Sequence, residues 1–416
     1  MHETLEKQSG KWTRTTWLIL LCWLVYACSY IGKLSYSANI AEIEKHYAIN
    51  YKTAGAVTTF FFFAYGAGQV INGLLCKKYN LKYVVFGSLL VSGAANLLAA
   101  VVQNFAFVKY LWLINGASMS VLWPSLIRLL SENLDKKDVA RAVVIMGTTV
   151  ATGTFLVYGM SALFVALGNF RITFFVAATL LPTIAFVWFI FEPKLTLKNE
   201  GKQAEEEKLL GKEERALGGF VLASLCVLAL FAVVNNFVKD GLTTWTPDIL
   251  ASLYGLQGWT SILLTLLLPL LAIFGTVVAT ALHKRIKSFV GICMLFFGVS
   301  ALLIATVILL LTIRAVPITI ACFAVVACLM AGVNNVITSM TPLSLKGRAN
   351  SGMIAGLLNG FCYLGSTLSS YGLGSVADAY HWSAVFYLLL ACCVLTVAVG
   401  ACLLIVQKSK KKEFLG

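Results

Sequence analysis

The sequence carries little charge, and few of its residues are acidic. Only 12% of the 416 residues are charged, with 18 Asp or Glu against 32 Lys or Arg. Hydrophobic residues make up 59% of the chain, and the mean hydropathy is +0.85. A soluble domain of this size does not need so much apolar sequence, and the apolar runs have the length of bilayer-spanning helices, about 20 residues. The composition therefore predicts an all-α integral membrane protein embedded in the lipid bilayer.

Motifs that carry enzyme chemistry are also missing. The 11 cysteines include no C-x-x-C pair, and the four histidines lie at predicted helix ends or in loops, so no metal-ligand spacing is present. There is no Walker A motif, dinucleotide fingerprint or nucleophile–base arrangement. We therefore expect no enzyme activity, no metal and no other cofactor. Without an ATP-binding loop, any uphill transport would have to draw on a gradient.

The apolar segments predict twelve transmembrane helices, six on each side of a charged stretch. The first six are Thr15–Ala38, Thr53–Leu75, Tyr83–Val102, Val108–Leu130, Ala142–Val165 and Ile172–Phe191. The second six are Gly219–Lys239, Thr260–Leu282, Phe289–Leu311, Ile318–Ser339, Ser351–Ser370 and Ser383–Val406. The predicted domains are an N-terminal six-helix bundle over 1–193, a cytoplasmic linker over 194–217 and a C-terminal six-helix bundle over 218–416. Two such halves with a substrate site between them are typical of secondary transporters.

The placement of the basic residues predicts the topology. Most of them fall in loops on the side that also holds both termini, which places that side in the cytoplasm. Because they are scattered over short loops, we do not expect nucleic-acid binding. The first ten residues are polar and the first apolar segment is too long for a signal core, so no cleavable signal peptide is predicted. We expect a multi-pass protein of the plasma (bacterial inner) membrane with both termini cytoplasmic.

Two lysines lie within or at the end of membrane-length segments, and they are the leading site candidates. Lysine at the centre of a span costs about 2.5–3.5 kcal/mol on insertion scales, so such a residue usually faces a watery cavity or a partner. Tyr26, Tyr30 and Lys33 share one face of the first helix. Lys239 in the second half follows Asn235 by one turn, with Asn236 beside it. We expect the two lysines to face one central cavity from symmetric positions; the alternative is snorkelling to the outer interface.

Polar residues in other spans supply further candidates for the cavity wall. They are Tyr65 and Gln69 in the second span, and Asn359 and Tyr363 in the eleventh. The alternative for each is a hydrogen bond that holds two helices together. Arg128 lies one turn before Glu132, and this spacing favours an ion pair or a gate over a ligand.

Acidic residues within the spans are rare, and two have candidate gating or structural roles. Asp240 follows Lys239 directly but should point about 100° away from it on a helix. Asp378 lies near the outer end of the eleventh span. A cavity with two cations and few acids suits an anionic substrate, to which lysine offers a point charge.

Several short runs spread over both halves match a known family. They are Tyr30-Ile-Gly-Lys33, Trp123-Pro124 with Arg128, Phe237-Val-Lys239-Asp-Gly241-Leu-Thr-Thr-Trp245-Thr-Pro247, Gly352 to Gly365, and Gly374-x-x-x-Asp378-x-x-x-Trp382. The chain resembles the major facilitator superfamily, and within it the organophosphate:phosphate antiporter branch, which contains the glycerol-phosphate and hexose-phosphate transporters. The resemblance implies a monomeric antiporter that works by alternating access.

On that resemblance, Lys33 and Lys239 occupy the positions of two arginines that bind the phosphoryl group. Lysine at both positions keeps the charge but loses the planar fork of arginine. The fifth span also departs from the family, since Gly147–Gly153 lacks its histidine.

These observations predict a secondary active transporter of a small anionic, phosphorylated metabolite that exchanges with phosphate or another anion. One alternative is a proton-coupled permease or exporter of a different organic substrate, with Asp240 or Asp378 as the proton carrier. A second, weaker alternative is a transporter-like sugar-phosphate sensor, because the resembling branch includes such sensors.

Overall fold

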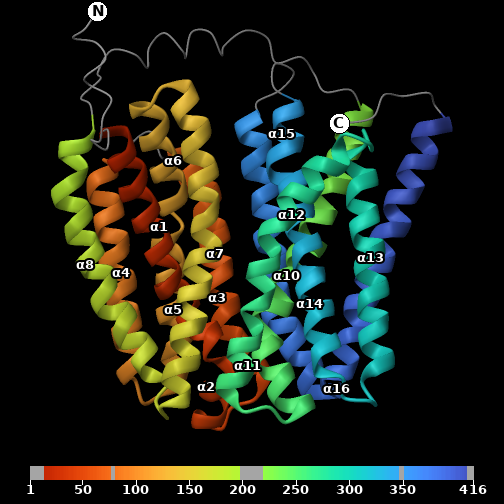
Figure 1. Cartoon of the computed structure of the whole chain (residues 1–416), viewed down its shortest axis with the longest axis horizontal. Helices are drawn as coiled ribbons and strands as arrows, with labels where there is room; N and C mark the ends of the chain where they lie inside the picture. Colours follow the sequence, from red (N-terminus) through yellow and green to blue (C-terminus); the bar gives the residue numbers. More distant parts are fainter. Residues whose placement is uncertain (1–13, 76–79, 197–218, 346–350, 410–416) are drawn as a thin grey trace, which may run out of the picture.

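The computed structural model describes residues 14–75, 80–196, 219–345 and 351–409, and the regular secondary structure in them is helical. Figure 1 shows two bundles side by side, one made of α1–α8 and the other of α10–α16. The start of α1 and the end of α16 lie at the same end of the molecule, at the top of the view. The predicted linker over 194–217 lies almost wholly outside the described residues.

The N-terminal bundle begins with two helices separated by a short break. Its elements are α1 (Arg14–Ala38), α2 (Ile40–Tyr47), α3 (Tyr51–Leu75), α4 (Leu81–Val101), the 3₁₀ turn η3 (Phe105–Phe107), α5 (Val108–Met119), α6 (Leu122–Asn133), α7 (Lys136–Ala166) and α8 (Arg171–Leu195).

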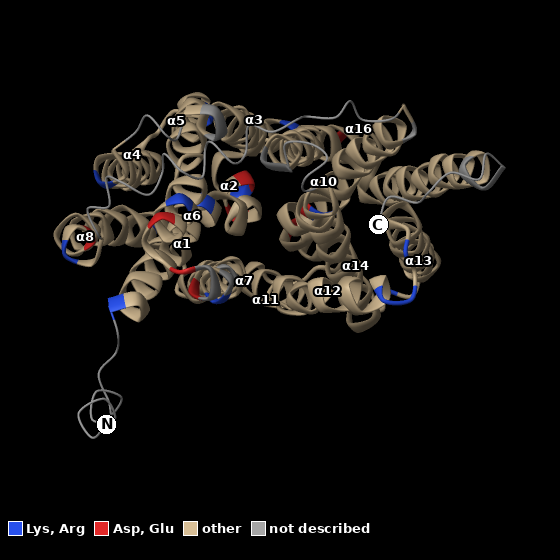
Figure 2. Ribbon diagram, turned by 90° about the horizontal axis from the view of Figure 1, so that it is seen from above, with Lys and Arg blue, Asp and Glu red and all other residues tan. Residues whose placement is uncertain are grey.

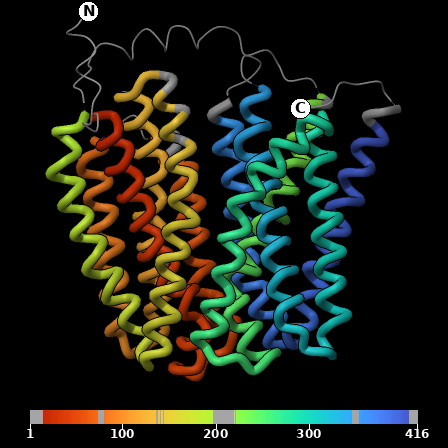
Figure 3. The backbone as a smooth tube through the Cα atoms, in the orientation of Figure 1, coloured from red at the N-terminus to blue at the C-terminus, as the bar shows by residue number. Residues whose placement is uncertain are grey.

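The C-terminal bundle begins with a long helix. Its elements are α10 (Gly219–Tyr254), α11 (Gly258–Thr265), α12 (Leu267–His283), α13 (Phe289–Leu310), α14 (Val316–Asn335), the π-helical turn η4 (Val336–Met340), α15 (Thr341–Ser344) and α16 (Ser351–Ser409). The tube in Figure 3 follows the same order from red to blue.

The predicted fold of twelve membrane-spanning helices is confirmed. Eleven of the described helical segments are long and apolar enough to cross a membrane, and the last of them, Met353–Val406, contains two predicted spans. The two are joined at a kink at His381, where φ is 63°. Charged residues are sparse along the helices, as the view from above shows (Figure 2).

One predicted boundary was wrong, and the error matters for the site. The seventh span was expected to end at Lys239, but α10 continues to Tyr254. The polar run Lys239-Asp240-Gly241 was interpreted as a helix end. It stays helical because the two charges neutralise each other and the apolar pattern resumes after Pro247. Lys239 therefore lies well inside a span, which excludes the snorkelling alternative for this residue.

Two prolines leave backbone carbonyls within the spans without their helical donors. Proline has no N–H, so the carbonyl four residues before it loses its helical donor. Pro124 frees the carbonyl of Ser120, where the predicted fourth span breaks into α5 and α6, and the Gln69 side chain donates to this carbonyl at 3.2 Å. Pro247 likewise frees the carbonyl of Thr243, and the Tyr158 hydroxyl of the other bundle donates to it at 3.2 Å.

The two bundles are held together at the end that carries α2 and α11, which we call the closed end. Among the described residues, the hydrogen bonds between the bundles involve the first part of α3 or the last part of α7. Both carboxylate oxygens of Asp378 accept from the backbone N–H groups of Tyr51 and Lys52, at 3.0 and 2.7 Å. Toward the other end the bundles spread apart (Figure 1).

Candidate functional site

The rotation of α1, and with it the direction of Lys33, is fixed by the carbonyl of Gly32. The side-chain amides of Asn96 and Asn115 both donate to this carbonyl, at 3.1 and 3.0 Å. A side chain at position 32 would collide with Leu181 and with Ser92. The Gly32 face of α1 is therefore pressed into the N-terminal bundle, and the adjacent Lys33 is half-buried.

The ammonium group of Lys33 lies among four aromatic rings. Its Nζ is 4.2 Å from the ring centre of Tyr65, 5.1 Å from Tyr30, 5.9 Å from Phe61 and 6.0 Å from Tyr363. Tyr363 belongs to α16, so the rings come from both bundles. Aromatic faces stabilise a cation within about 6 Å without neutralising it. Among the described residues Lys33 forms no ion pair.

The predicted tyrosine stripe on α1 continues this aromatic group. Tyr26 packs edge-on against Tyr30, with ring centres 5.6 Å apart, and against Trp123 at 4.9 Å. Tyr65 and Tyr363, on opposite sides of the bundle interface, are 4.8 Å apart. The structure thus brings together Lys33 and four of the predicted site residues: Tyr26, Tyr30, Tyr65 and Tyr363.

Lys239 has different surroundings, because a carboxylate neutralises it. Its Nζ lies 3.4 Å from Oδ1 of Asp240, and the other carboxylate oxygen accepts from the Ser366 hydroxyl at 2.5 Å. The expectation that Asp240 points away from Lys239 was wrong. The Cα–Cβ bonds of adjacent helical residues do diverge, but the four-carbon stem of lysine is long enough to bend back to its neighbour.

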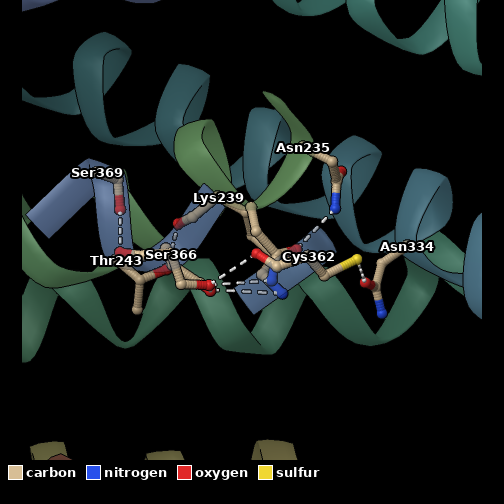
Figure 4. A network of polar contacts seen from close by, with 9 residues as sticks. Asn235, Lys239, Thr243, Asn334, Cys362, Ser366 and Ser369 are labelled. Carbon is tan, nitrogen blue, oxygen red and sulfur yellow. Dashed lines mark hydrogen bonds and ion pairs between the residues drawn. The ribbon is translucent and has the colours of Figure 1, made fainter. Parts of the chain in front are cut away.

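Asn235 and Asn236 are buried and belong to the same polar network (Figure 4). Asn235 donates to the Oδ1 of Asn236 at 3.0 Å, and Asn236 donates to Ser366 at 3.1 Å. Cys362, one turn before Ser366, contacts the Oδ1 of Asn334 at 3.5 Å. The network therefore joins α10, α14 and α16 within the C-terminal bundle, and it fixes the position of Asp240.

The two lysines differ in their counter-charges. Lys239 is paired with Asp240, whereas Lys33 forms no ion pair among the described residues. With Lys239 and Asp240 cancelling, the region carries one uncompensated positive charge, on Lys33. That both lysines face one cavity stays a prediction.

Other predicted site residues lie outside this group. The Gln69 amide donates to the carbonyl that Pro124 frees, which is a hydrogen bond between two helices. The place of Gln69 in a cavity wall stays a prediction. Arg128 pairs with Glu132 at 2.5 Å near the end of α6. Asp378 bridges the bundles at the closed end. Asn359 lies on α16 one turn before Tyr363 and is half-buried.

Sequence reasoning missed two buried acids at the closed end, Glu44 on α2 and Asp248 on α10. Their exposed fractions are 7% and 4%, and their carboxyl groups lie within hydrogen-bonding reach of each other. Glu44 falls between the first two predicted spans, and the early end given to the seventh span placed Asp248 in a loop. The apolar residues that follow Asp248 were the signal that the helix continues. Within the described ranges, no group of three His, Cys, Asp or Glu is placed to hold a metal ion.

Comparison with known proteins agrees with this architecture. Residues 22–370 match the model of the Major Facilitator Superfamily. The membrane sensor protein UhpC of Escherichia coli is 22% identical over 404 residues, which cover 92% of this chain and 89% of that protein. The human voltage-gated purine nucleotide uniporter SLC17A9 is 24% identical over 175 residues, covering 41% of this chain and 40% of that protein.

Solved structures with the same fold include transporters. A bacterial homologue of the human lysosomal transporter Spinster, in an inward-facing and occupied conformation, has a TM-score of 0.76 at 12% identity, over 96% of this chain and 98% of that one. A mutant of the nucleoside transporter NupG has a TM-score of 0.68 at 13% identity, over 94% of this chain and all of that one.

The chain is therefore a multi-pass membrane protein with the fold of these transporters. It belongs to the Major Facilitator Superfamily. Its similarity to UhpC supports the resemblance to the organophosphate:phosphate antiporter branch.

Proposed function

We propose that this protein moves a small anionic metabolite, with a phosphorylated compound as the preferred class, by exchange with phosphate or another anion. One observation carries the proposal: the uncompensated ammonium of Lys33, which lies among rings from both bundles. An anion at this point would gain a charge-assisted hydrogen bond from Lys33. It would also contact both halves, as alternating access requires.

The tyrosines around Lys33 suit such a ligand. Each phenol group can donate a hydrogen bond to an anion oxygen, while its ring face stabilises the lysine. The neutralised Lys239–Asp240 pair offers a second contact. An arriving anion would compete with Asp240 for Lys239, which would loosen the contact between Asp240 and Ser366 on α16. Substrate binding would in this way disturb the packing of α10 against α16.

The conformation fits one stage of an exchange cycle. The bundles meet at the closed end and spread toward the end with the termini. With both termini in the cytoplasm, as the basic loops predict, this is the inward-facing stage of a transporter in the plasma membrane. We expect the protein to act as a monomer.

Counterflow in proteoliposomes tests the proposal. Labelled inorganic phosphate is added outside vesicles that are either empty or preloaded with unlabelled phosphate or a phosphate ester. We expect uptake only into preloaded vesicles and its loss in Lys33→Ala. Equal uptake into empty vesicles would contradict exchange. No uptake by folded protein of any phosphate compound would contradict the substrate class.

A second candidate function rests on the similarity to the two UhpC proteins, whose names describe membrane sensors. A sensor would bind the anion without moving it. Saturable binding by the purified protein, together with no counterflow by the same preparation, would favour the sensor over the transporter.

A further inference from the structure

Two carboxyl groups from opposite bundles are buried against each other at the closed end. Glu44 comes from α2 of the N-terminal bundle and Asp248 from α10 of the C-terminal bundle. Oε1 of Glu44 and Oδ2 of Asp248 are both buried and have no hydrogen-bond donor among the described residues. Two ionised carboxylates in this position would repel each other and leave buried acceptors without a partner, which is costly. One proton shared between them would remove both penalties.

We infer that Glu44 and Asp248 form a proton-binding site that exists only while the closed end is closed. The site needs both bundles, because each contributes one of the two oxygens. When the bundles separate at this end, each carboxyl meets water and ionises separately. Closure of this end therefore takes up a proton, and opening releases it. This inference does not depend on the identity of the transported compound.

None of the charged or titratable groups named here around Glu44 and Asp248 supplies a positive charge that could stabilise two ionised carboxylates. Asp378 of α16 acts on both carboxyls, the phenols of Tyr36 on α1 and Tyr51 on α3 lie in the same region, and Lys45 next to Glu44 is exposed. No lysine or arginine of the described chain forms an ion pair with either acid. Burial, as the largest cause, followed by the neighbouring Asp248 and Asp378, raises the pKa of Glu44 far above its ordinary value.

The proton has a route to the surface at the closed end. Ser252, one turn after Asp248, is exposed, and its hydroxyl contacts the Asp248 carboxylate at 3.5 Å. The Tyr51 hydroxyl lies 3.1 Å from the same serine. Because the proton enters and leaves at the same end, this site is a gate that senses pH on that face. It does not carry protons across the membrane, which distinguishes it from the proton carrier that the proton-coupled alternative places at Asp240 or Asp378.

The sign of the pH dependence follows from the raised pKa. A group whose pKa is higher in the closed conformation stabilises that conformation at low pH and loses this effect as pH rises. One shared proton changes the ratio of closed to open molecules by up to about tenfold per pH unit between the pKa values of the open and closed conformations. We expect the closed population to fall as pH rises from the ordinary pKa of glutamate, about 4.3, toward the raised pKa of Glu44.

Single-molecule fluorescence measures this population in the full chain without substrate. Fluorophores are attached through non-canonical amino acids at Leu167 and Ile313, which are exposed at the closed ends of the two bundles. The native cysteines stay in place. The wild type should lose its short-distance population as pH rises.

Glu44→Gln and Asp248→Asn test the role of the acids. In each variant the new amide donates to the remaining carboxylate, so we expect the closed end to stay closed with no pH dependence. Asp135→Asn, an exposed acid directly before α7 and outside the closed end, is the control and should keep the wild-type pH response. A wild-type response in both Glu44→Gln and Asp248→Asn would overturn the inference, and so would loss of the response in Asp135→Asn. Because no substrate is present, these outcomes are independent of the proposed anion transport.

Discussion

The two lysines differ at the scale of single residues, although they look equivalent in the sequence. Lys33 keeps its charge among four aromatic rings, whereas Lys239 is neutralised by its chain neighbour. An anion should therefore depend on Lys33 for attraction, and on Lys239 only after it has displaced Asp240. This asymmetry gives Asp240 a role in limiting how tightly an anion is held.

Replacing Asp240 with Asn tests that role. The change leaves the half-buried Lys239 without its counter-charge, so the melting temperature should fall by a few degrees without ligand. Added phosphate should then raise the melting temperature more in this variant than in the wild type, because the freed ammonium gains a partner. Asp135→Asn, an exposed acid before α7, serves as the control. An equal shift in all three proteins would show that Lys239 does not meet the anion.

The sequence was sufficient to select these residues but not to describe their partners. Charged residues inside apolar segments stand out, and their spacing showed which tyrosines share a face with Lys33. Tyr363 lies more than 300 positions away, and no local pattern shows that it meets Lys33. The ion pair between Lys239 and Asp240 was not predicted either. Helical geometry gives the direction of the Cα–Cβ bond, but not the position of the charged group at the end of a long side chain.

At the scale of elements, Pro124 and Pro247 each free a backbone carbonyl within a span, and a side chain on another helix donates a hydrogen bond to it. The Gln69 side chain of α3 donates to the carbonyl of Ser120, four residues before Pro124. The Tyr158 hydroxyl of α7 donates to the carbonyl of Thr243, four residues before Pro247. Neither hydrogen bond could be predicted from the sequence. A proline indicates that a carbonyl lacks its helical donor, but not which side chain of another helix donates to it instead. These bonds explain why polar residues on a helix face need not line a cavity.

A double-mutant cycle tests the bond between Gln69 and Ser120. Gln69→Leu leaves the carbonyl without its donor and should cost about 1–3 kcal/mol of stability. Pro124→Ala restores an N–H at position 124, so Gln69→Leu should cost much less in that background. Unfolding in a chemical denaturant measures all four proteins. Additive effects of the two changes would contradict the assignment.

Gly365 allows α16 to pack closely against α10. A side chain at Gly365 would collide with the carbonyl of Val233, whereas a side chain at Gly356 on the same helix would meet open space. Gly365→Ala should therefore destabilise the protein by about 1–3 kcal/mol through overpacking, and Gly356→Ala should have little effect. Thermal unfolding of the pair checks the expectation. Similar melting temperatures for the two variants would refute the close approach.

At the scale of the whole molecule, the twelve spans and the two halves followed from the lengths and order of the apolar segments. The closed end did not, because its contacts join residues about 200 to 330 positions apart. Glu44 and Asp248 were overlooked for the same reason. Each looks like an ordinary loop acid until the fold places it opposite the other. The proposed anion binding at Lys33 and the proposed proton binding at the closed end would therefore be two separate controls on one interface.

The central claim is that Lys33 holds an anion between the two bundles, and equilibrium binding of labelled phosphate to the purified protein tests it most directly. We expect saturable binding by the wild type, affinity at least about tenfold weaker in Lys33→Gln, and little change in Lys109→Gln. Lys109 also faces aromatic rings but lies on α5, away from the site. Size-exclusion chromatography confirms that each variant is folded. Phosphate binding with unchanged affinity in folded Lys33→Gln would contradict the account.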